Sequence, residues 1–417
     1  MSSSPSRFHY GWVILAMATL VVFGALGLAR FGYTAVLPAM QAELEMNNTQ
    51  AGALATANLV GYLALSVIGG AMAARYGPRA VIGVGLAVAG VGMLLTGLAN
   101  GFYGAALWRG VTGVGSGASN VPVMGLLAAW FARRRRGLAA GIAVAGSSLG
   151  LILVGRIAPR ILSAYGENGW RVCWFVFGGV ALLLAAASLL ILRNRPWRAG
   201  MMRARAEVDE SPPASQEKAL PWASVYWSPT VFHVGTVYAA FGFSYIIYMT
   251  FFVKCLVAEG GYSEQAAGRL FMIMGWFSVL CGLIWGTVSD VIGRKGALVI
   301  VYLIHTVAFG LFALWPAPAG FTVSAVLFGL SAWSIPAIMA ALCGDLLGAR
   351  LAPAGLGFIT LLFGIGQAIG PSVAGAIADA ADSLLPAMLL ASGVALLGAI
   401  GSALLRPASL RRAAEGA

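Results

Sequence analysis

Long apolar stretches separated by short polar turns run along nearly the whole chain. Six of them precede residue 193 and six follow residue 228. They lie near residues 10–40, 50–73, 80–99, 102–131, 137–162 and 170–192, then 229–257, 265–289, 297–316, 320–345, 354–378 and 386–405. A helix of about 20 apolar residues crosses the apolar core of a bilayer. The pattern therefore predicts an all-α membrane protein with twelve transmembrane helices.

One polar stretch interrupts this pattern. It is rich in charges and carries Pro196, Pro212 and Pro213, a composition that favours a linker over a packed element. We therefore expect three parts: a six-helix bundle over 1–193, a linker over 194–228, and a second six-helix bundle over 229–417 that ends in a short tail.

The two halves repeat each other. Four glycines of the first half recur 220 positions later: Gly137, Gly146, Gly150 and Gly155 correspond to Gly357, Gly366, Gly370 and Gly375. Gly115 and Pro122 recur 214 positions later as Gly329 and Pro336. Parallel repeats of six spans are a transporter architecture.

Composition excludes other classes of protein. Hydrophobic residues make up 60% of the chain, charged residues 10%, and the mean hydropathy is +0.87, which no soluble domain matches. The four cysteines are widely separated within spans and show no metal or disulfide spacing. A membrane enzyme would need a catalytic cluster, and the sequence shows none of the known motifs. We expect neither enzymatic activity nor a cofactor.

The formal charge of +12 is explained by membrane topology. Most of them fall in the turns on the side shared by the two termini and the linker. By the positive-inside rule this side is cytoplasmic, so the charge needs no nucleic acid partner. The first apolar stretch continues past Arg30 to Pro38 and reads as an uncleaved helix. We expect a monomer in the lipid bilayer of a bacterial inner membrane, with both termini cytoplasmic.

Two loops carry a more specific signal. Gly70 to Arg79 (GAMAARYGPR) and Gly286 to Lys295 (GTVSDVIGRK) each follow the second span of a half, and Arg109 to Gly117 reads RGVTGVGSG. They resemble the signature loops and the fourth-helix motif of the major facilitator superfamily. Ala29 to Pro38 and Gly364 to Pro371 look like its YbfB/YjiJ branch, which adjoins the bacterial relatives of monocarboxylate and oxalate:formate carriers.

The resemblance implies two bundles that rock around a central site. It also implies that Arg79, Asp290 and Arg294 act at a cytoplasmic gate. Ala74 stands where the first loop of the family usually has an acidic residue, so only Asp290 can serve as the carboxylate anchor. The segment Gly141 to Gly150 of the fifth span lacks the proline that many drug exporters have, which weakens an efflux reading. Spans eight and eleven lack the central basic residues of carboxylate carriers, so a simple monocarboxylate assignment is in doubt.

Charge inside the predicted spans is unbalanced. Arg30, Arg109 and Arg156 lie within spans, whereas the acidic residues lie in loops, in the linker or tail, or near span ends. An arginine in the middle of a bilayer must find a partner, and a guanidinium matches a carboxylate with two parallel hydrogen bonds. For Arg30 and Arg109 a substrate contact competes with a structural role, and Arg156 could instead reach the membrane surface.

Further residues are candidates for the wall of a central cavity. Each has packing as its alternative role. With the two arginines, they form the predicted substrate site: Arg30, Tyr33, Asn58, Tyr62, Arg109, Asn120, Tyr238, Tyr245, Tyr248, Trp276, Trp333 and Gln367.

These features predict a secondary transporter that takes up an organic anion together with protons. A proton can travel on the substrate carboxylate, on His305 or on Asp290, whereas sodium needs a cage of oxygen ligands. A drug or metabolite exporter, an organic-anion exchanger and a non-transporting sensor or scaffold of the same fold stay open as alternatives.

Overall fold

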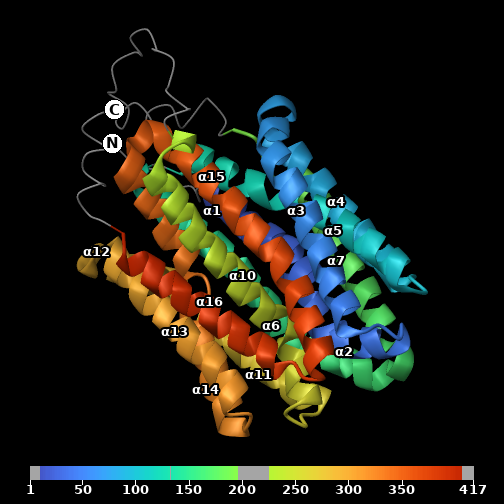
Figure 1. Cartoon of the computed structure of the whole chain (residues 1–417). Helices are drawn as coiled ribbons and strands as arrows, with labels where there is room; N and C mark the ends of the chain where they lie inside the picture. The colour runs from blue at the N-terminus through green and yellow to red at the C-terminus, as the bar shows by residue number, and fades with distance from the viewer. Residues whose placement is uncertain (1–9, 132, 196–224, 406–417) are drawn as a thin grey trace, which may run out of the picture.

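The computed structural model describes residues 10–131, 133–195 and 225–405. Every regular element in these ranges is a helix. Figure 1 shows the helices of the first half, blue to green, beside those of the second half, yellow to red. The expected linker lies mostly outside the described residues.

The first half follows the predicted spans closely. Its first span is one continuous rod that contains a π-helical stretch, and a short 3₁₀ turn, η2 (Gly166–Asn168), precedes the last helix. The elements are α1 (Gly11–Val22), η1 (Phe23–Phe31), α2 (Gly32–Glu43), α3 (Asn48–Tyr76), α4 (Pro78–Gly97), α5 (Phe102–Trp130), α6 (Arg133–Tyr165) and α7 (Gly169–Ile191).

The second half contains two broken spans. The eighth predicted span is divided between α11 and α12, and the tenth between α14 and α15. Within α15, Gly348, with φ of 66°, separates the tenth span from the eleventh. The helices are α10 (Pro229–Ala258), α11 (Glu264–Ser278), α12 (Cys281–Ile292), α13 (Arg294–Leu314), α14 (Pro318–Ser331), α15 (Ser334–Ala381) and α16 (Leu385–Ala403).

Helix covers each of the twelve predicted ranges, yet fewer helices pass a strict test of length and apolarity. Among the described residues, eight qualify, or nine if the bent α3 counts as one span. Two reasons are geometric: α6 and α7 run together as one 57-residue segment, and α11 and α12 have only 15 and 12 residues.

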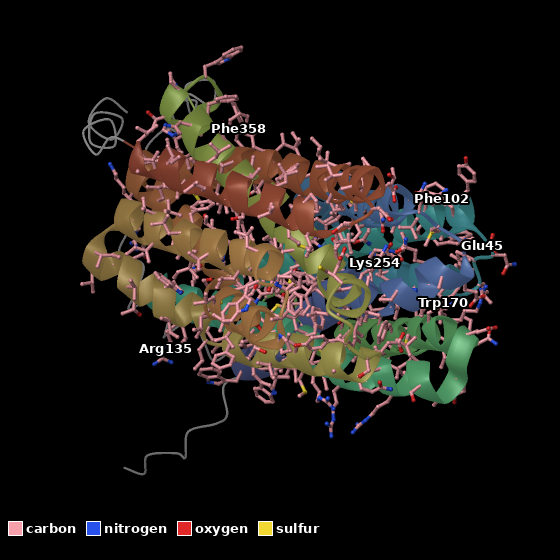
Figure 2. All side chains as sticks on the ribbon, turned by 60° about the horizontal axis from the view of Figure 1, so that its bottom comes forward. Glu45, Phe102, Arg135, Trp170, Lys254 and Phe358 are labelled. Carbon is pink, nitrogen blue, oxygen red and sulfur yellow. The ribbon has the colours of Figure 1, made fainter. Side chains whose placement is uncertain are left out.

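The molecule has two ends. We call the end that holds Gly11, Ile191 and Pro229 the linker end, and the end that holds the turns 44–47, 259–263 and 382–384 the distal end. Figure 2 shows Arg135 and Phe358 at the linker end, and Glu45, Phe102 and Trp170 at the distal end.

Close helix packing follows the sequence repeat. A side chain on Gly146 would collide with Thr19 and Phe23, and one on Gly366 would collide with Ala239 and Phe243. Each residue of the second set lies 220 positions after its counterpart. The same small residue therefore lets the fifth span of each half approach the first span of that half.

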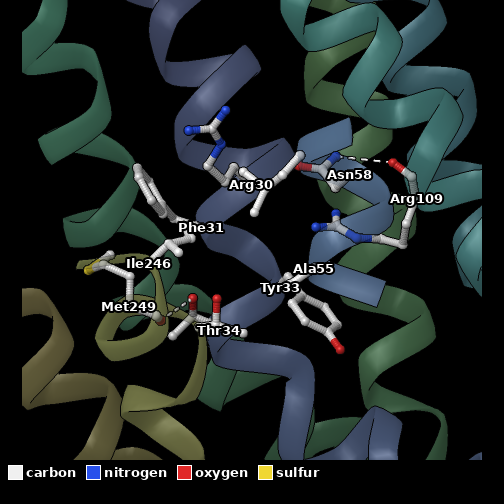
Figure 3. A pocket seen from close by; sticks show the side chains of 11 residues that line it. Arg30, Phe31, Tyr33, Thr34, Ala55, Asn58, Arg109, Ile246 and Met249 are labelled. Carbon is white, nitrogen blue, oxygen red and sulfur yellow. Dashed lines mark hydrogen bonds between the residues drawn. The ribbon is translucent and has the colours of Figure 1, made fainter. Parts of the chain in front are cut away.

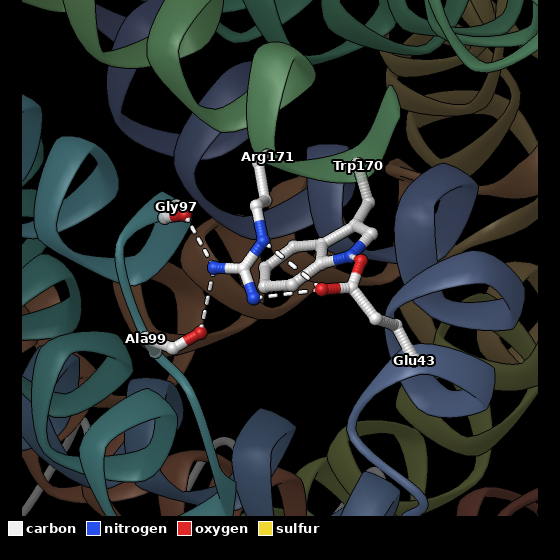
Figure 4. A network of polar contacts seen from close by, with 5 residues as sticks. All are labelled: Glu43, Gly97, Ala99, Trp170 and Arg171. Carbon is white, nitrogen blue, oxygen red and sulfur yellow. Dashed lines mark hydrogen bonds and ion pairs between the residues drawn. The ribbon is translucent and has the colours of Figure 1, made fainter. Parts of the chain in front are cut away.

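A polar cluster fixes the distal end of the first half (Figure 4). The guanidinium of Arg171 donates to Glu43 Oε1 at 2.7 Å and to the carbonyl oxygens of Gly97 and Ala99 at 3.0 and 2.8 Å, while Trp170 Nε1 donates to Glu43 Oε2. These bonds join the ends of α2, α4 and α7.

Hydrogen bonds between described residues of the two halves join the middle and the distal part of the helices. Thr34 Oγ1 donates to the Met249 carbonyl at 2.8 Å, and Thr56 Oγ1 donates to the Ala368 carbonyl at 2.7 Å. Toward the linker end, a Cβ added at Gly70 or Gly286 would meet no atom within 4 Å. The bonds of Thr34 and Thr56 therefore join the halves at the level of the pocket and on its distal side.

Candidate functional site

A pocket lies between the halves near the middle of the helices (Figure 3). Its free space is about 10 Å³, which is room for about one water molecule. Two arginines and several hydroxyl groups line it, and no carboxylate is among its described lining residues. The lining is Arg30, Phe31, Tyr33, Thr34, Ala55, Asn58, Leu59, Arg109, Ile246, Met249 and Thr250.

Arg30 has two nitrogens that lack hydrogen-bond partners among the described residues. Its Nε and NH2 atoms are buried, and neither has a partner within the described part of the chain. Its guanidinium lies over the ring of Tyr62, 4.3 Å from the centroid, and the hydroxyl of Tyr245 lies beside it. A cation–π contact offsets only part of the cost of removing an arginine from water.

Asn120 extends the group formed by Arg30, Tyr62 and Tyr245 toward the linker end. Its Nδ2 donates to the Tyr62 hydroxyl at 2.8 Å. The hydroxyl proton of Tyr62 remains available for a ligand, because the oxygen acts as the acceptor in this bond. The Oδ1 atom of Asn120 is buried and has no partner among the described residues.

Polar and aromatic residues of the second half also lie near Arg30. Gln367 on α15 donates from Nε2 to the Tyr245 hydroxyl on α10. Trp333 packs against Phe31 with ring centroids 5.5 Å apart, and its Nε1 donates to Ser148 Oγ of the first half at 3.0 Å. Predicted residues from both halves thus meet around Arg30.

Arg109 is bound to the protein. It is only 1% exposed, and its NH1 donates to the carbonyl oxygen of Ala29 at 2.6 Å. Ala29 belongs to the π-helical stretch η1, where the backbone hydrogen-bond pattern changes. The rings of Tyr33 and Trp174 lie 4.8 and 5.0 Å from the guanidinium carbon. Arg109 thus joins α5 to the first span, the structural role that the sequence left open.

Two other predicted residues line the pocket, and each donates a hydrogen bond to the backbone of a neighbouring helix. Tyr33 donates its hydroxyl hydrogen to the Ala51 carbonyl at 2.7 Å, and Asn58 Nδ2 donates to the Arg109 carbonyl at 3.1 Å. Both side chains fix neighbouring helices.

The aromatic residues of α10 divide into two groups. Tyr238, Phe241 and Tyr245 stack on Phe363 of α15, with the Tyr238 and Phe363 centroids 4.4 Å apart. They form a wall beside the pocket. Tyr248, further along α10, does not belong to this wall.

Tyr248 turns into the core of the second half. Its hydroxyl is hydrogen bonded to Ser324 Oγ at 2.8 Å, and its ring packs against Phe309 and Phe328. Trp276 is 61% exposed on a face of α11 that also carries exposed Arg269. The structure therefore places neither Tyr248 nor Trp276 at the pocket. The prediction failed for these two residues because the spacing along one helix does not show which neighbours surround each position.

His305 also lies apart from the pocket. It is fully buried in α13, where its ring stacks on Phe241 and Phe309 and packs against Phe328. The backbone of Ser331 lies beside the ring, and neither ring nitrogen makes a hydrogen bond of good geometry within the described ranges. Phe241 separates it from Tyr245.

The residues expected at a cytoplasmic gate lie at the linker end. Asp290 pairs with Arg294, and Arg294 Nε also donates to Asp345 Oδ2 of α15 at 3.0 Å. Gly293 holds the loop turn with φ of 85°, a conformation that favours glycine. In the first loop, Arg79 has an exposed side chain. Arg156 is likewise exposed on α6.

Sequence reasoning missed several features of the site. The π-helical stretch η1 has no sequence signal beyond Gly24 and Gly27. Thr34 shares a helix face with Arg30 in the sequence, but nothing there indicates its bond to the other half. Lys254 near the distal end of α10 was also overlooked. Its position inside an apolar span was a usable signal.

Comparison with known proteins agrees with this architecture. The family model described as "Uncharacterised MFS-type transporter YbfB" matches residues 22–402. The chain belongs to the YbfB-type family of major facilitator superfamily transporters. It is therefore a multi-pass membrane transporter, and the fold expected from the sequence is confirmed.

Relatives of this YbfB-type transporter include the hexuronate transporter of Bacillus subtilis, 25% identical over 395 residues and covering 89% of each chain. The probable sulfoacetate transporter of Cupriavidus necator is 26% identical, with 95% of this chain and 94% of its own covered. Human monocarboxylate transporter 11 is 24% identical and covers 95% of this chain and 83% of its own.

Solved structures show the same fold. A bacterial homologue of the human lysosomal transporter Spinster, in an inward-facing and unoccupied conformation, superposes on this YbfB-type transporter with a TM-score of 0.70 at 16% identity, covering 99% of this chain and 98% of its own. A point mutant of the nucleoside transporter NupG gives 0.73 at 12% identity, covering 94% and 99%.

Proposed function

We propose that this protein is a secondary transporter of an organic anion, and that Arg30 binds the anionic group. The observation that carries the proposal is the pair of buried Arg30 nitrogens without partners, beside a pocket whose described lining has no carboxylate. A buried cation without a counterion is costly. An anionic substrate would supply the missing acceptors.

The neighbours of Arg30 match such a ligand. The Tyr62 and Tyr245 hydroxyls accept hydrogen bonds from Asn120 and Gln367, so each retains a proton to donate to an oxyanion. Phe31 and Trp333 provide an apolar surface. Relatives named for hexuronate, sulfoacetate and monocarboxylate support a carboxylate or sulfonate that carries a small organic body.

Transport would proceed by alternating access between two bundles, residues 1–193 and 229–417. A pocket of about 10 Å³ cannot hold an organic anion, because one water already takes up about that space. The halves must move apart to admit it. The positive-inside rule assigns the linker end to the cytoplasm and the distal end to the periplasm of a bacterial inner membrane.

Uptake would be coupled to protons. Bringing an anion into a cell against an inside-negative potential costs about 2.3 kcal/mol per charge per 100 mV. A proton can travel on the substrate itself, which removes this cost. Sodium would need several oxygen ligands.

Flux into proteoliposomes tests whether the protein carries an organic anion and whether that transport is coupled to protons. Labelled glucuronate, sulfoacetate and lactate would be offered with an imposed pH gradient, with and without sodium, and with or without unlabelled anion inside. Saturable flux that rises with the inward proton gradient supports proton-coupled uptake. A strict sodium requirement contradicts proton coupling, and flux only against internal anion identifies an exchanger. Outward transport of organic cations, with no anion flux, would identify an exporter.

A further inference from the structure

At the distal end, a carboxylate of the second half holds the start of a helix in the first half. Asp379 Oδ1 accepts a hydrogen bond from the backbone N–H of Asn48, and Oδ2 accepts one from the N–H of Thr49, both at 2.8 Å. Thr49 Oγ1 donates a third, at 2.6 Å, to Oδ2. All three bonds join α15 to the first turn of α3.

This contact goes beyond local capping of α3. The helix already has its own cap: Asn47 accepts from the Gln50 N–H at 2.8 Å, and Gln50 accepts from the Asn47 N–H at 3.1 Å. Asp379 binds the two remaining free N–H groups of the first turn, where the helix dipole also favours negative charge. A cap inside one helix needs no residue from 330 positions away. The contact therefore serves the junction between the halves.

A cation from a third helix strengthens the same junction. Lys254 on α10 donates from Nζ to Gln41 Oε1 at 2.5 Å and also to Asn48 Oδ1. Asn48 is therefore held through its backbone by Asp379 and through its side chain by Lys254. Figure 2 shows Lys254 among the packed helices of this region.

The internal repeat shows that only one of the two equivalent junctions between the halves has this polar contact. Gly375 packs against the Asn48 carbonyl, and its repeat counterpart Gly155 packs against the carbonyl of Gly268, the counterpart of Asn48. At the position 220 residues before Asp379 stands Pro159, which packs on Gly268 through its ring. One of the two equivalent junctions is thus apolar, and the other is made of charge-assisted hydrogen bonds.

We propose that Asp379, bonded to Asn48 and Thr49, is a releasable latch that holds the distal side closed. The inference rests on the alternating-access proposal above. The latch joins helices that carry polar residues near Arg30: α3 carries Tyr62 and α15 carries Gln367. Lys254 adds α10, which carries Tyr245. A rearrangement of these helices around an anion therefore reaches the latch directly, and charge-assisted bonds can exchange with water when they open.

Side-specific labelling tests the latch. A cysteine at pocket residue Ala55 would be exposed to a membrane-impermeant maleimide in right-side-out and in inside-out vesicles, and the four native cysteines, all buried, give the background. Asp379→Asn should raise labelling from the distal side about threefold or more, because loss of the latch shifts the population toward distal opening. Thr49→Val should give a smaller rise.

Asp382→Asn is the matched control. Asp382 is exposed, lies three residues further along, and is the C-cap of the same helix, so it reports the loss of one carboxylate at this end. Equal labelling of Asp379→Asn and Asp382→Asn, in protein that still elutes as a monodisperse peak, would overturn the latch. Failure of the parent protein to bind or carry any anion would instead overturn the proposed function, and the labelling result would stand apart from it.

Discussion

Arg109 and Arg30 differ in one decisive bond. Arg109 NH1 donates to the carbonyl oxygen of Ala29 at 2.6 Å, whereas the Nε and NH2 atoms of Arg30, the next residue along η1, have no partner within the described residues. Both arginines line one pocket. Arg30 belongs to the helix turn that Arg109 contacts. Arg109 is tied to this turn through NH1, although its Nε is also buried without a partner among the described residues. Arg30 keeps two such nitrogens and has the Tyr245 hydroxyl beside it.

Replacing Arg30 should abolish most anion affinity. Hydrogen bonds to charged groups contribute about 1.5–3 kcal/mol, so Arg30→Ala should weaken binding by about tenfold to a hundredfold. Arg30→Lys should also lose affinity, because an ammonium cannot reproduce the planar fork. Ligand-dependent thermal shifts with glucuronate, sulfoacetate and lactate measure this. Unchanged affinity in folded Arg30→Ala protein would remove Arg30 from the site.

Replacing Arg109 should mainly affect stability. Arg109→Ala leaves a cavity between the Tyr33 and Trp174 rings and removes the hydrogen bond to the Ala29 carbonyl, a combined cost of about 3 kcal/mol or more. We expect a melting temperature in detergent that is several degrees below that of the parent. Arg30→Ala is the comparison, with a smaller drop. The assignment fails if Arg109→Ala melts like the parent and loses only anion binding.

A carboxylate at position 120 should block the site. Asn120 contacts Tyr62, whose ring lies under the Arg30 guanidinium, so Asn120→Asp places an acceptor where it can pair with Arg30. Anion binding should weaken by about tenfold or more, since a pairing worth about 1.4 kcal/mol is tenfold. Asn120→Ser, which adds no charge, is the control. Similar affinity in the Asp and Ser variants would separate Asn120 from the anion site.

Loss of His305 should leave transport coupled as before. The ring lies among Phe241, Phe309 and Phe328 in the second half, away from the residues that line the pocket. His305→Phe conserves the aromatic packing and removes a polar ring from this apolar cluster, so flux and its dependence on the pH gradient should stay within about twofold of the parent. Flux that no longer responds to the gradient would instead assign proton transfer to His305.

The sequence by itself determined the membrane fold. Spans of apolar residues must be helical in a bilayer because every backbone polar group needs an internal partner, and the glycine repeat fixed which spans pack alike. The same energetics identified Arg30 and Arg109 as unusual, because a charge inside a span is expensive wherever the helix lies.

Only the tertiary structure decided what each of these residues does. The role of Arg109 depends on a carbonyl in a π-helical turn 80 residues away, and that of Asp379 depends on the first turn of α3, 330 residues away. Spacing along one helix likewise gave no sign that Tyr245 faces Arg30 while Tyr248 faces Ser324. A hydrogen bond depends on distance and direction, and between helices both are set by how the two halves pack.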